Sequence, residues 1–369
     1  MNRKAKILYK EWLFIIIAWI FITNFFSWLV LVNLGLFMDI TQVRIMGEEN
    51  VIAQYLSSGY QYLEGTLFGI FFGFAFGLIN HFISDSKIRR KSFGKIILIE
   101  STLYFGALVG AFIIVYLVLK IFDIFPKDVE LLNYANFITL EYILSMGLYF
   151  AFFIILTNFI LQVNKKFGPG NLAKMMLGTY HTPKEEHKIF LFLDLKDSTG
   201  IAEKLGHKTY SQFLANCYYD LTDIILKYKA DVYQYVGDEV VLFWDVKTGL
   251  EDLNCIKTYF AFEKKISGQK EFYFNNYGIL PEFKCGMDMG YVTAAEVGDI
   301  KREIAYHGDV LNTAARIQEQ CKQFGTKVLI SEHIEEKLPS LKSFQKEYIG
   351  EVKLRGKRED VKIFSITYS

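Results

Sequence analysis

The chain has 369 residues, enough for two domains, and its formal net charge of +1 gives no argument for nucleic-acid binding. Its hydrophobic content of 52% and mean hydropathy of +0.21 exclude an ordinary soluble protein of this length. The four cysteines have no Cys-x-x-Cys spacing, which excludes an obvious zinc site and predicts free thiols in a reducing compartment. They are Cys217, Cys255, Cys285 and Cys321.

The first 163 residues contain four long apolar stretches, at residues 12–37, 62–83, 96–119 and 137–163. Each has about the 20 residues that a helix needs to cross a bilayer core, and none has an arginine or lysine in its interior. We therefore expect a membrane domain of residues 1–163 with four transmembrane helices. A cleaved signal peptide is the alternative for the first stretch, but no small-x-small cleavage site follows it.

Positive charge in the short loops sets the expected orientation in the membrane. Basic residues precede the first stretch and separate the second from the third, whereas the other two loops are mainly acidic. These basic residues are Arg3, Lys4, Lys6 and Lys10, then Lys87, Arg89, Arg90, Lys91 and Lys95. We expect a multi-pass protein in the lipid of the plasma (inner) membrane, with both termini and the C-terminal domain in the cytoplasm.

The predicted membrane helices contain the acids Glu100 and Glu141. A carboxylate in the hydrocarbon core is costly, so we expect Glu100 and Glu141 to face the interior of the helix bundle. There they would either hold the helices together or belong to a sensor for an unidentified ligand of the membrane domain.

A basic run and then Gly168-Pro169-Gly170, which cannot continue a helix, follow the fourth stretch. We interpret residues 164–187 as a juxtamembrane linker and residues 188–369 as a separate domain. Strands are predicted at 188–195, 231–236, 239–244, 282–292, 294–298, 328–331 and within 351–365, and helices at 198–228, 250–274 and 310–324. This order predicts an α+β domain with helices on one face of a mainly antiparallel sheet.

Two isolated acids stand at the ends of apolar, strand-like runs. Asp194 follows residues 189–193, and Asp238 lies in the turn between two predicted strands. A buried carboxylate needs a partner, and two carboxylates at one end of a sheet suit a divalent ion such as Mg²⁺ or Mn²⁺. The alternatives are a helix N-cap for Asp194 and ordinary turn chemistry for Asp238.

Polar residues on two predicted helices extend this pattern. The four residues after Leu195 open a helix, whose free backbone N–H groups form a site for phosphate. They are Lys196, Asp197, Ser198 and Thr199. Asn312 and Arg316 are four residues apart and so share one face of a later helix. Two carboxylates and an Asn-x-x-x-Arg helix together predict metal-dependent chemistry on a nucleoside triphosphate.

Four blocks of sequence, in this order, resemble the class III nucleotide cyclases. They are Phe-Leu-Asp-Leu-Lys-Asp-Ser-Thr at 192–199, Tyr-Val-Gly-Asp-Glu at 235–239, His-Gly-Asp-Val-Leu-Asn-Thr-Ala-Ala-Arg at 307–316 and Gly-Glu-Val-Lys-Leu-Arg-Gly-Lys at 350–357. Each block alone is weak, but the ordered set is specific, and the resemblance covers residues 186–369. It implies a ferredoxin-like α+β cyclase catalytic domain.

The resemblance also implies roles for individual residues. Asp194 and Asp238 would bind two metal ions per site, helped by the backbone carbonyl of Leu195. These ions would activate the ribose 3′-hydroxyl for attack on the α-phosphorus. Asn312 would orient the ribose, and Arg316 would stabilise the charge that develops on the α-phosphate.

Other positions depart from the family pattern. Arg355 stands where the family has a phosphate-binding lysine, and Asp197 stands where many relatives have glycine, so it would either cap the helix or repel the triphosphate. Adenine-specific members have a lysine and an aspartate or threonine at the positions of Gln234 and Ala305. Guanine-specific members usually have an acid at the first of these positions, so ATP is favoured here.

In this family the active site forms between two catalytic domains, one supplying the metal acids and the other the asparagine and arginine. This chain carries both sets, which implies a head-to-tail homodimer. We therefore predict a membrane-bound adenylate cyclase that converts ATP into cyclic AMP and pyrophosphate, regulated by its membrane domain. The alternatives are a cyclase for GTP or a pyrimidine nucleotide, and a membrane receptor with an inactive cyclase-like dimerisation domain. A diguanylate cyclase is disfavoured because its Gly-Gly-acid-acid signature is absent.

Overall fold

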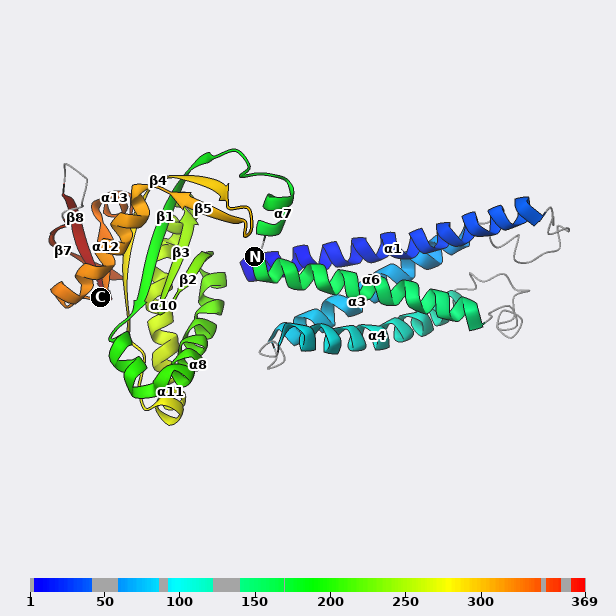
Figure 1. Cartoon of the computed structure of the whole chain (residues 1–369), viewed down its shortest axis with the longest axis horizontal. Coiled ribbons are helices and arrows are strands. Elements are labelled where there is room, and N and C mark those ends of the chain that lie inside the picture. Colours follow the sequence, from blue (N-terminus) through cyan, green and yellow to red (C-terminus); the bar gives the residue numbers. More distant parts are fainter. Residues whose placement is uncertain are drawn as a thin grey trace. The chain divides into compact units, whose positions relative to one another are not determined.

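The structure, a computed structural model, describes residues 3–41, 59–85, 92–121, 140–168, 170–339, 343–352 and 360–368. The chain divides into two compact units, one of residues Ala5–Pro169 and the other of residues Gly170–Ser369. Figure 1 shows the first as a group of long helices and the second as a mixed sheet with helices packed against it.

Long apolar helices make up the first unit. They are α1 (Arg3–Thr41), α3 (Tyr60–Asp85), α4 (Phe93–Ile121) and α6 (Leu140–Phe167). Within the described residues, the spans that are long and apolar enough to cross a membrane are Leu8–Asn33, Tyr60–Ile83, Phe93–Ile121 and Ile143–Phe167. The predicted four apolar helices are therefore confirmed, with shifted boundaries.

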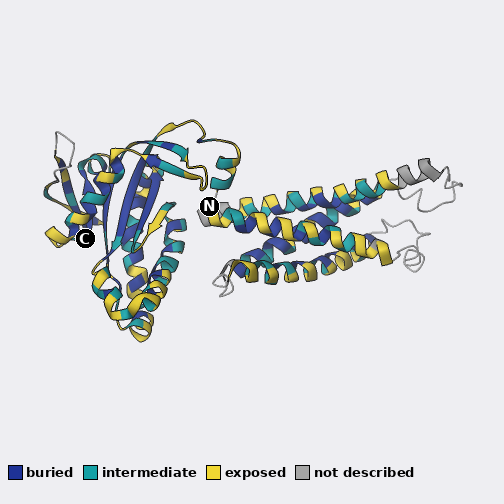
Figure 2. Cartoon of the chain, in the orientation of Figure 1, coloured by how far each residue is buried: buried dark blue, intermediate teal, exposed yellow. Residues whose placement is uncertain are grey.

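Aromatic side chains fill the interior of this unit, while many apolar side chains on its outside are exposed. Figure 2 shows buried, intermediate and exposed residues alternating along its helices. Trp19, Phe72 and Tyr104 are completely buried, and the rings of Trp19 and Phe72 meet edge to face with centroids 4.4 Å apart. The backbones of α1 and α3 approach closely at Gly69, which has no side chain. A Cβ at this position would lie only 2.6 Å from the Cα of Ile20. Close packing through glycine and an apolar outer surface are typical of helices in a membrane.

Polar side chains of different helices pair with one another in the first unit. The Gln162 amide donates to Oε2 of Glu100 at 2.7 Å, and the Lys165 ammonium donates to Oδ1 of Asn80 at 2.7 Å. Glu100 is 1% exposed, so its predicted position inside the bundle is confirmed. The same prediction for Glu141 is wrong. It is exposed in the first turn of α6, where the positive end of the helix dipole favours a carboxylate.

The second unit alternates strands and helices. Its helices are α7 (Asn171–Met176), α8 (Ser198–Lys227), α9 (Val246–Leu250), α10 (Asn254–Gly268), α11 (Lys270–Tyr277), α12 (Asp309–Phe324) and α13 (Glu332–Glu335), with a 3-10 turn at Glu251–Leu253. Its strands are β1 (Lys184–Leu195), β2 (Asp231–Val236), β3 (Glu239–Asp245), β4 (Phe283–Val297), β5 (Glu303–His307), β6 (Val328–Ser331), β7 (Phe344–Val352) and β8 (Val361–Tyr368).

The strands form one sheet in the order β2-β3-β1-β4-β6-β8-β7, with β5 paired to β4, and only β4 and β6 among the described pairs are parallel. Side chains of the central strand β1 alternate between the two faces. Ile189, Leu191 and Leu193 pack with α8 and α10, whereas Phe190 and Phe192 pack with α12 on the other face. The expectation of helices on one face only is therefore wrong.

Several element boundaries differ from the sequence prediction. β4 runs without a break through Thr293, which pairs with His307, where two strands were expected. β5 was not predicted, because its five residues are too few to show a periodic apolar pattern. The predicted break in α8 is present, since Gly206 has φ 70° and ψ 156° inside the helix. β1 begins at Lys184, earlier than the predicted strand.

The four cysteines are free and buried, as the sequence predicted. Burial raises the pKa of the Cys217 and Cys255 thiols to about 12 and that of Cys321 to about 11. The pKa of Cys285 is also raised by burial. These thiols are therefore protonated at neutral pH.

Helix α12 lies very close to β4 at Gly286. A Cβ at this position would lie 2.2 Å from the backbone nitrogen of Gln318 and 2.6 Å from the carbonyl oxygen of Ala314. Because both are backbone atoms, the helix itself would have to move. We expect Gly286→Ala to cost about 3 kcal/mol and to lower the thermal unfolding midpoint of the purified chain by about 6 °C or more. Gly268→Ala is the control, since a Cβ there meets nothing within 4 Å. Equal midpoints for the two variants would contradict this packing.

Candidate active site

An acid cluster lies at the end of β1, beside the turn between β2 and β3. Asp194 is opposite Glu239 of β3 on one side and Lys284 of β4 on the other. Asp238 precedes Glu239 in the turn, and Tyr218 of α8 donates a 3.0 Å hydrogen bond to the carbonyl of the adjacent glycine. Both predicted metal acids therefore lie at the same end of the sheet.

Two side chains hold Asp194 in place, and neither was predicted. The Lys284 ammonium lies 3.2 Å from Asp194 Oδ2, and the Gln318 amide of α12 donates to the same oxygen at 2.9 Å. Within the described residues no side chain donates to the other oxygen, Oδ1. The sequence held one sign of the Lys284 contact, since this lysine lies between the apolar residues Phe283 and Cys285 of a predicted strand.

Negative charge in this cluster is only partly balanced. Burial, and to a smaller degree the charge of Asp238, raises the pKa of Asp194, while its contact with Lys284 opposes the shift. Burial and the two aspartates also raise the pKa of Glu239 to about 7. A cation bound beside these carboxylates would stabilise their charged forms.

The donor set fits Mg²⁺ or Mn²⁺. Asp194 and Asp238 offer carboxylate oxygens, and the backbone carbonyl of Leu195 is adjacent. Within the described residues, no three His, Cys, Asp or Glu side chains are grouped so as to hold a metal by themselves. Magnesium is commonly held by one or two carboxylates, with the substrate phosphates and water completing its shell. The site therefore suits an ion that binds together with a triphosphate.

An acidic side chain, Asp197, lies at the start of α8, where the sequence predicted a binding site for phosphate. Residues 198–199 begin its first turn, and Asp197 precedes them with a left-handed φ of 56°. Asp197 makes no capping hydrogen bond, and its carboxylate oxygens lie 2.9 Å from where a Cβ on Gly200 would be. Lys196 is exposed and pairs with Glu282 at 2.9 Å. The Asp197 carboxylate thus stands over the helix N-terminus, so phosphate there would meet a negative charge.

Asn312 and Arg316 lie on the side of α12 that faces away from the sheet. At about 100° per residue, they are roughly 160° and 200° around the helix from Ala314, which packs against Gly286. Asn312 is exposed and Arg316 partly exposed, and neither side chain makes a hydrogen bond or ion pair with another described residue. They therefore share one face, as predicted, but that face is not the one that contacts Asp194.

The two residues predicted to select the base flank a pair of touching rings. Gln234 is exposed on β2 next to Tyr233, and Ala305 lies on β5 next to Tyr306. The rings of Tyr233 and Tyr306 meet edge to face with centroids 5.4 Å apart. Strands β2 and β5 thus come together across the face of the sheet, although they are not neighbours within it. Arg355 lies outside the described residues.

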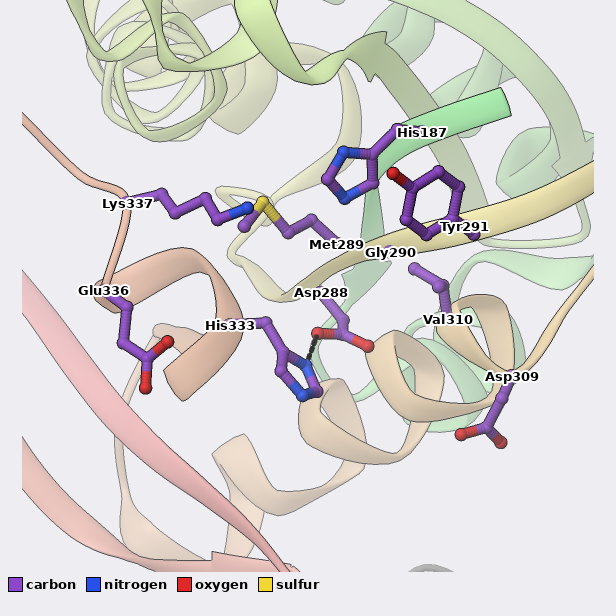
Figure 3. A pocket seen from close by; sticks show the side chains of 10 residues that line it. All are labelled: His187, Asp288, Met289, Gly290, Tyr291, Asp309, Val310, His333, Glu336 and Lys337. Atoms are coloured by element: carbon purple, nitrogen blue, oxygen red, sulfur yellow. Dashed lines mark hydrogen bonds and ion pairs between the residues drawn. The ribbon is translucent and has the colours of Figure 1, made fainter. Parts of the chain in front are cut away.

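A pocket of about 370 Å³ lies elsewhere in this unit, lined by residues of β1, β4, α12 and α13 (Figure 3). Asp288 in its lining is 1% exposed, accepts a 2.5 Å hydrogen bond from Ser331 and pairs with His333 Nδ1 at 2.8 Å. His187 stacks on Tyr291 with ring centroids 4.5 Å apart, and burial lowers the pKa of His187. None of the predicted site residues lines this pocket.

The sheet of this unit thus has one acid at the end of its central strand β1 and a second in the turn between β2 and β3, and helix α12 presents an asparagine and an arginine. The family model of the adenylate and guanylate cyclase catalytic domain matches residues 180–368, and the chain belongs to this family.

Two curated relatives are similar to the chain. "Adenylate cyclase 2" of Rhizobium meliloti is 30% identical over 209 residues, which cover 57% of this chain and 58% of the relative. "Adenylate cyclase" of Anabaena cylindrica is 27% identical over 181 residues, covering 48% of this chain and 36% of the relative. The chain thus spans little more than half the length of one relative and about a third of the other. The crystal structure of an adenylyl cyclase from P. aeruginosa aligns with a TM-score of 0.45 and 20% identity, covering 51% of this chain and 96% of that one.

Proposed function

We propose that the chain is a membrane-bound adenylate cyclase that works as a head-to-tail homodimer and converts ATP into cyclic AMP and pyrophosphate. One observation carries this proposal. Asp194 and Asp238 gather at the sheet end, whereas Asn312 and Arg316 point away from the same sheet without partners among the described residues. A complete site then needs the acids of one chain and the Asn/Arg face of another.

The acids are proposed to bind two Mg²⁺ or Mn²⁺ ions together with the triphosphate. When bound, these ions lower the pKa of the ribose 3′-hydroxyl and neutralise the phosphate oxygens. Asp194 and Asp238 hold their carboxylates at the end of the sheet, and the hydrogen bonds to Oδ2 of Asp194 leave its Oδ1 available. The Leu195 carbonyl is the third oxygen donor.

The partner chain is proposed to complete the reaction geometry. The 3′-oxygen loses its proton to water and attacks the α-phosphorus in line, so a new P–O bond forms while the bond to the β-phosphate oxygen breaks and pyrophosphate leaves. Asn312 orients the ribose so that this oxygen is in line. Arg316 donates to the α-phosphate oxygens, where negative charge develops, and Arg355 is proposed to bind the leaving phosphates.

ATP is the proposed substrate because both curated relatives are named as adenylate cyclases, and because Gln234 places no acid at the base position. The Gln234 amide can donate to a ring nitrogen and accept from the adenine amino group, whereas Ala305 offers no side-chain hydrogen bond. A site with so few polar groups discriminates weakly between bases. We therefore propose measurable activity with GTP as well.

The apolar helices are proposed to anchor the enzyme in the plasma membrane, with residues 1–163 as the membrane domain, residues 164–187 as a linker and residues 188–369 as a cytoplasmic catalytic domain. The many basic residues before the first helix and between the second and third support this orientation. Regulation is proposed to arise in the membrane domain, where Glu100 is buried.

The function is tested by incubating the full chain, purified in detergent, with Mn²⁺ or Mg²⁺ and ATP, GTP, CTP or UTP separately, and resolving products by mass spectrometry. We expect cyclic AMP as the main product, with less cyclic GMP and nothing from Asp194→Asn. A main product other than cyclic AMP would keep the cyclase mechanism and overturn ATP as the substrate. No product from any nucleotide, with a folded and dimeric chain, would instead favour a receptor with an inactive dimerisation domain.

A further inference from the structure

Gln318 is a buried polar residue to which the proposed reaction assigns no role. It lies on α12, is 4% exposed, and donates its amide N–H to Asp194 Oδ2 at 2.9 Å. The residues are 124 positions apart in the sequence, so this contact depends on how α12 packs against the sheet. A side-chain amide that is buried and hydrogen-bonded to a carboxylate fixes the orientation of that carboxylate.

The position of Gln318 is fixed by the backbone around it. Helix α12 lies against β4 at Gly286, where an added Cβ would be 2.2 Å from the Gln318 nitrogen and 2.6 Å from its Cα. Lys284, two residues before Gly286 on β4, reaches the same Oδ2 of Asp194 at 3.2 Å. The carboxylate is therefore held by one neutral donor from the helix and one cationic donor from the strand.

These two donors have different consequences for a bound cation. The Lys284 ammonium neutralises the carboxylate and so competes with a metal for it. The Gln318 amide orients the carboxylate without adding positive charge. Both use Oδ2, so Oδ1 is the oxygen left for a cation. Hydrogen bonds from such outer partners orient metal ligands and contribute to metal affinity.

We propose that Gln318 is a positioning residue for the metal acid Asp194, so that each α12 helix serves both active sites of the dimer. One side of α12 carries Asn312 and Arg316 into the site of the partner chain, and the other side holds Asp194 in its own. This inference rests on the proposed two-chain cyclase. It makes α12 the rigid connection between the two sites.

The first test measures metal binding directly. Mn²⁺ is titrated into the full chain in detergent, with and without a non-cyclisable ATP analogue, and free Mn²⁺ is followed by electron paramagnetic resonance. We expect Gln318→Met, which keeps the size but removes the donor, to weaken Mn²⁺ binding by about tenfold. Gln323→Met, an exposed glutamine of the same helix, is the matched control and should bind as the parent does. Equal affinity for Gln318→Met and the parent overturns the proposal.

A second variant covers the case in which the methionine disturbs the helix. Gln318→Asn keeps an amide but withdraws it by one methylene, so the hydrogen bond to Oδ2 is lost. We expect Gln318→Asn, like Gln318→Met, to weaken Mn²⁺ binding by about tenfold. In either variant, activity at saturating Mn²⁺ should recover to within about threefold of the parent. At saturation the metal site is filled although its affinity is lower. A loss of turnover that saturating metal does not restore would indicate a merely structural role.

The second test asks which site Gln318 serves. Mixed dimers are purified from one chain with Arg316→Ala and one with Asp194→Asn, so that the intact site uses the Asp194 of the first chain and the Arg316 of the second. Gln318→Met on the first chain is expected to raise the Mn²⁺ requirement about tenfold, and on the second chain less than about twofold. An effect that follows the second chain instead shows that Gln318 acts through the Asn/Arg face and overturns the proposal.

The two tests separate failure of this inference from failure of the proposed function. Inactive mixed dimers would contradict the two-chain site, whereas the Mn²⁺ titration would still report whether Gln318 positions Asp194. If the mixed dimers are active and Gln318→Met binds metal as the parent does, the proposed two-chain cyclase stands and the positioning role of Gln318 is wrong.

Discussion

Asp194→Asn is expected to lower the rate of cyclic nucleotide formation by about 10³-fold or more, because a neutral amide in place of a carboxylate cannot hold a divalent ion with comparable affinity. Asp238→Asn should have a similar effect. The substitution keeps the size of the side chain, and the fold does not need a charge at position 194, since burial already disfavours the charged form of Asp194. The thermal unfolding midpoint should therefore stay close to that of the parent while activity is lost.

The control for this prediction is another aspartate in the same unit. Asp252 is exposed, has φ 52°, and lies in the short turn before α10, a conformation that asparagine also adopts readily. Asp252→Asn should leave activity unchanged. Initial rates are measured at several Mn²⁺ concentrations up to saturation. If Asp194→Asn and Asp238→Asn both retain more than a tenth of the parent activity, the two acids are not needed for the reaction and the prediction is wrong.

Mixing two inactive chains is expected to restore activity. Arg316→Ala alone should lower the rate by about 10²-fold to 10³-fold, because the charge on the α-phosphate loses its donor. A dimer of one Arg316→Ala chain and one Asp194→Asn chain has one intact site out of two, so its rate should be about half that of the parent. The gain over either inactive homodimer is then roughly two orders of magnitude or more.

The mixed dimer is isolated with a different affinity tag on each chain and compared with the two inactive homodimers. A dimer that carries both substitutions on one chain and none on the other has no intact site in the two-chain arrangement, so it serves as the matched control. If that control were active and the mixed dimer inactive, each site would be built within a single chain, and the head-to-tail arrangement would be wrong.

Much of the acid cluster could be predicted from local sequence. β2 and β3 begin and end close to the expected residues, because a Gly-Asp turn between two apolar runs determines a hairpin locally. The acid at the end of β1 follows in the same way from a buried run that stops at a charged residue. Asn312 and Arg316 share a face because helical periodicity alone requires it.

The partners of Asp194 could not be predicted in this way. The contact with Lys284 needs β1 and β4 to be neighbours, and the contact with Gln318 needs α12 on the face opposite to α8 and α10. The local periodicity of a segment determines neither the order of strands in a sheet nor the face of the sheet that a helix covers. Glu141 was misplaced for a related reason, because one turn of helix decides whether it lies inside or outside the apolar span.

The buried thiols of the second unit have a practical consequence for experiments on this protein. Cys217, Cys255 and Cys285 are 0% exposed and Cys321 is 2% exposed, and their raised pKa values leave little thiolate at neutral pH. Maleimides and thiosulfonates react with exposed thiolates, so the folded chain should stay unlabelled. A cysteine introduced at an exposed position would then be the sole reactive group. Spin labels, fluorophores or cross-linkers can therefore be attached without first replacing any native cysteine.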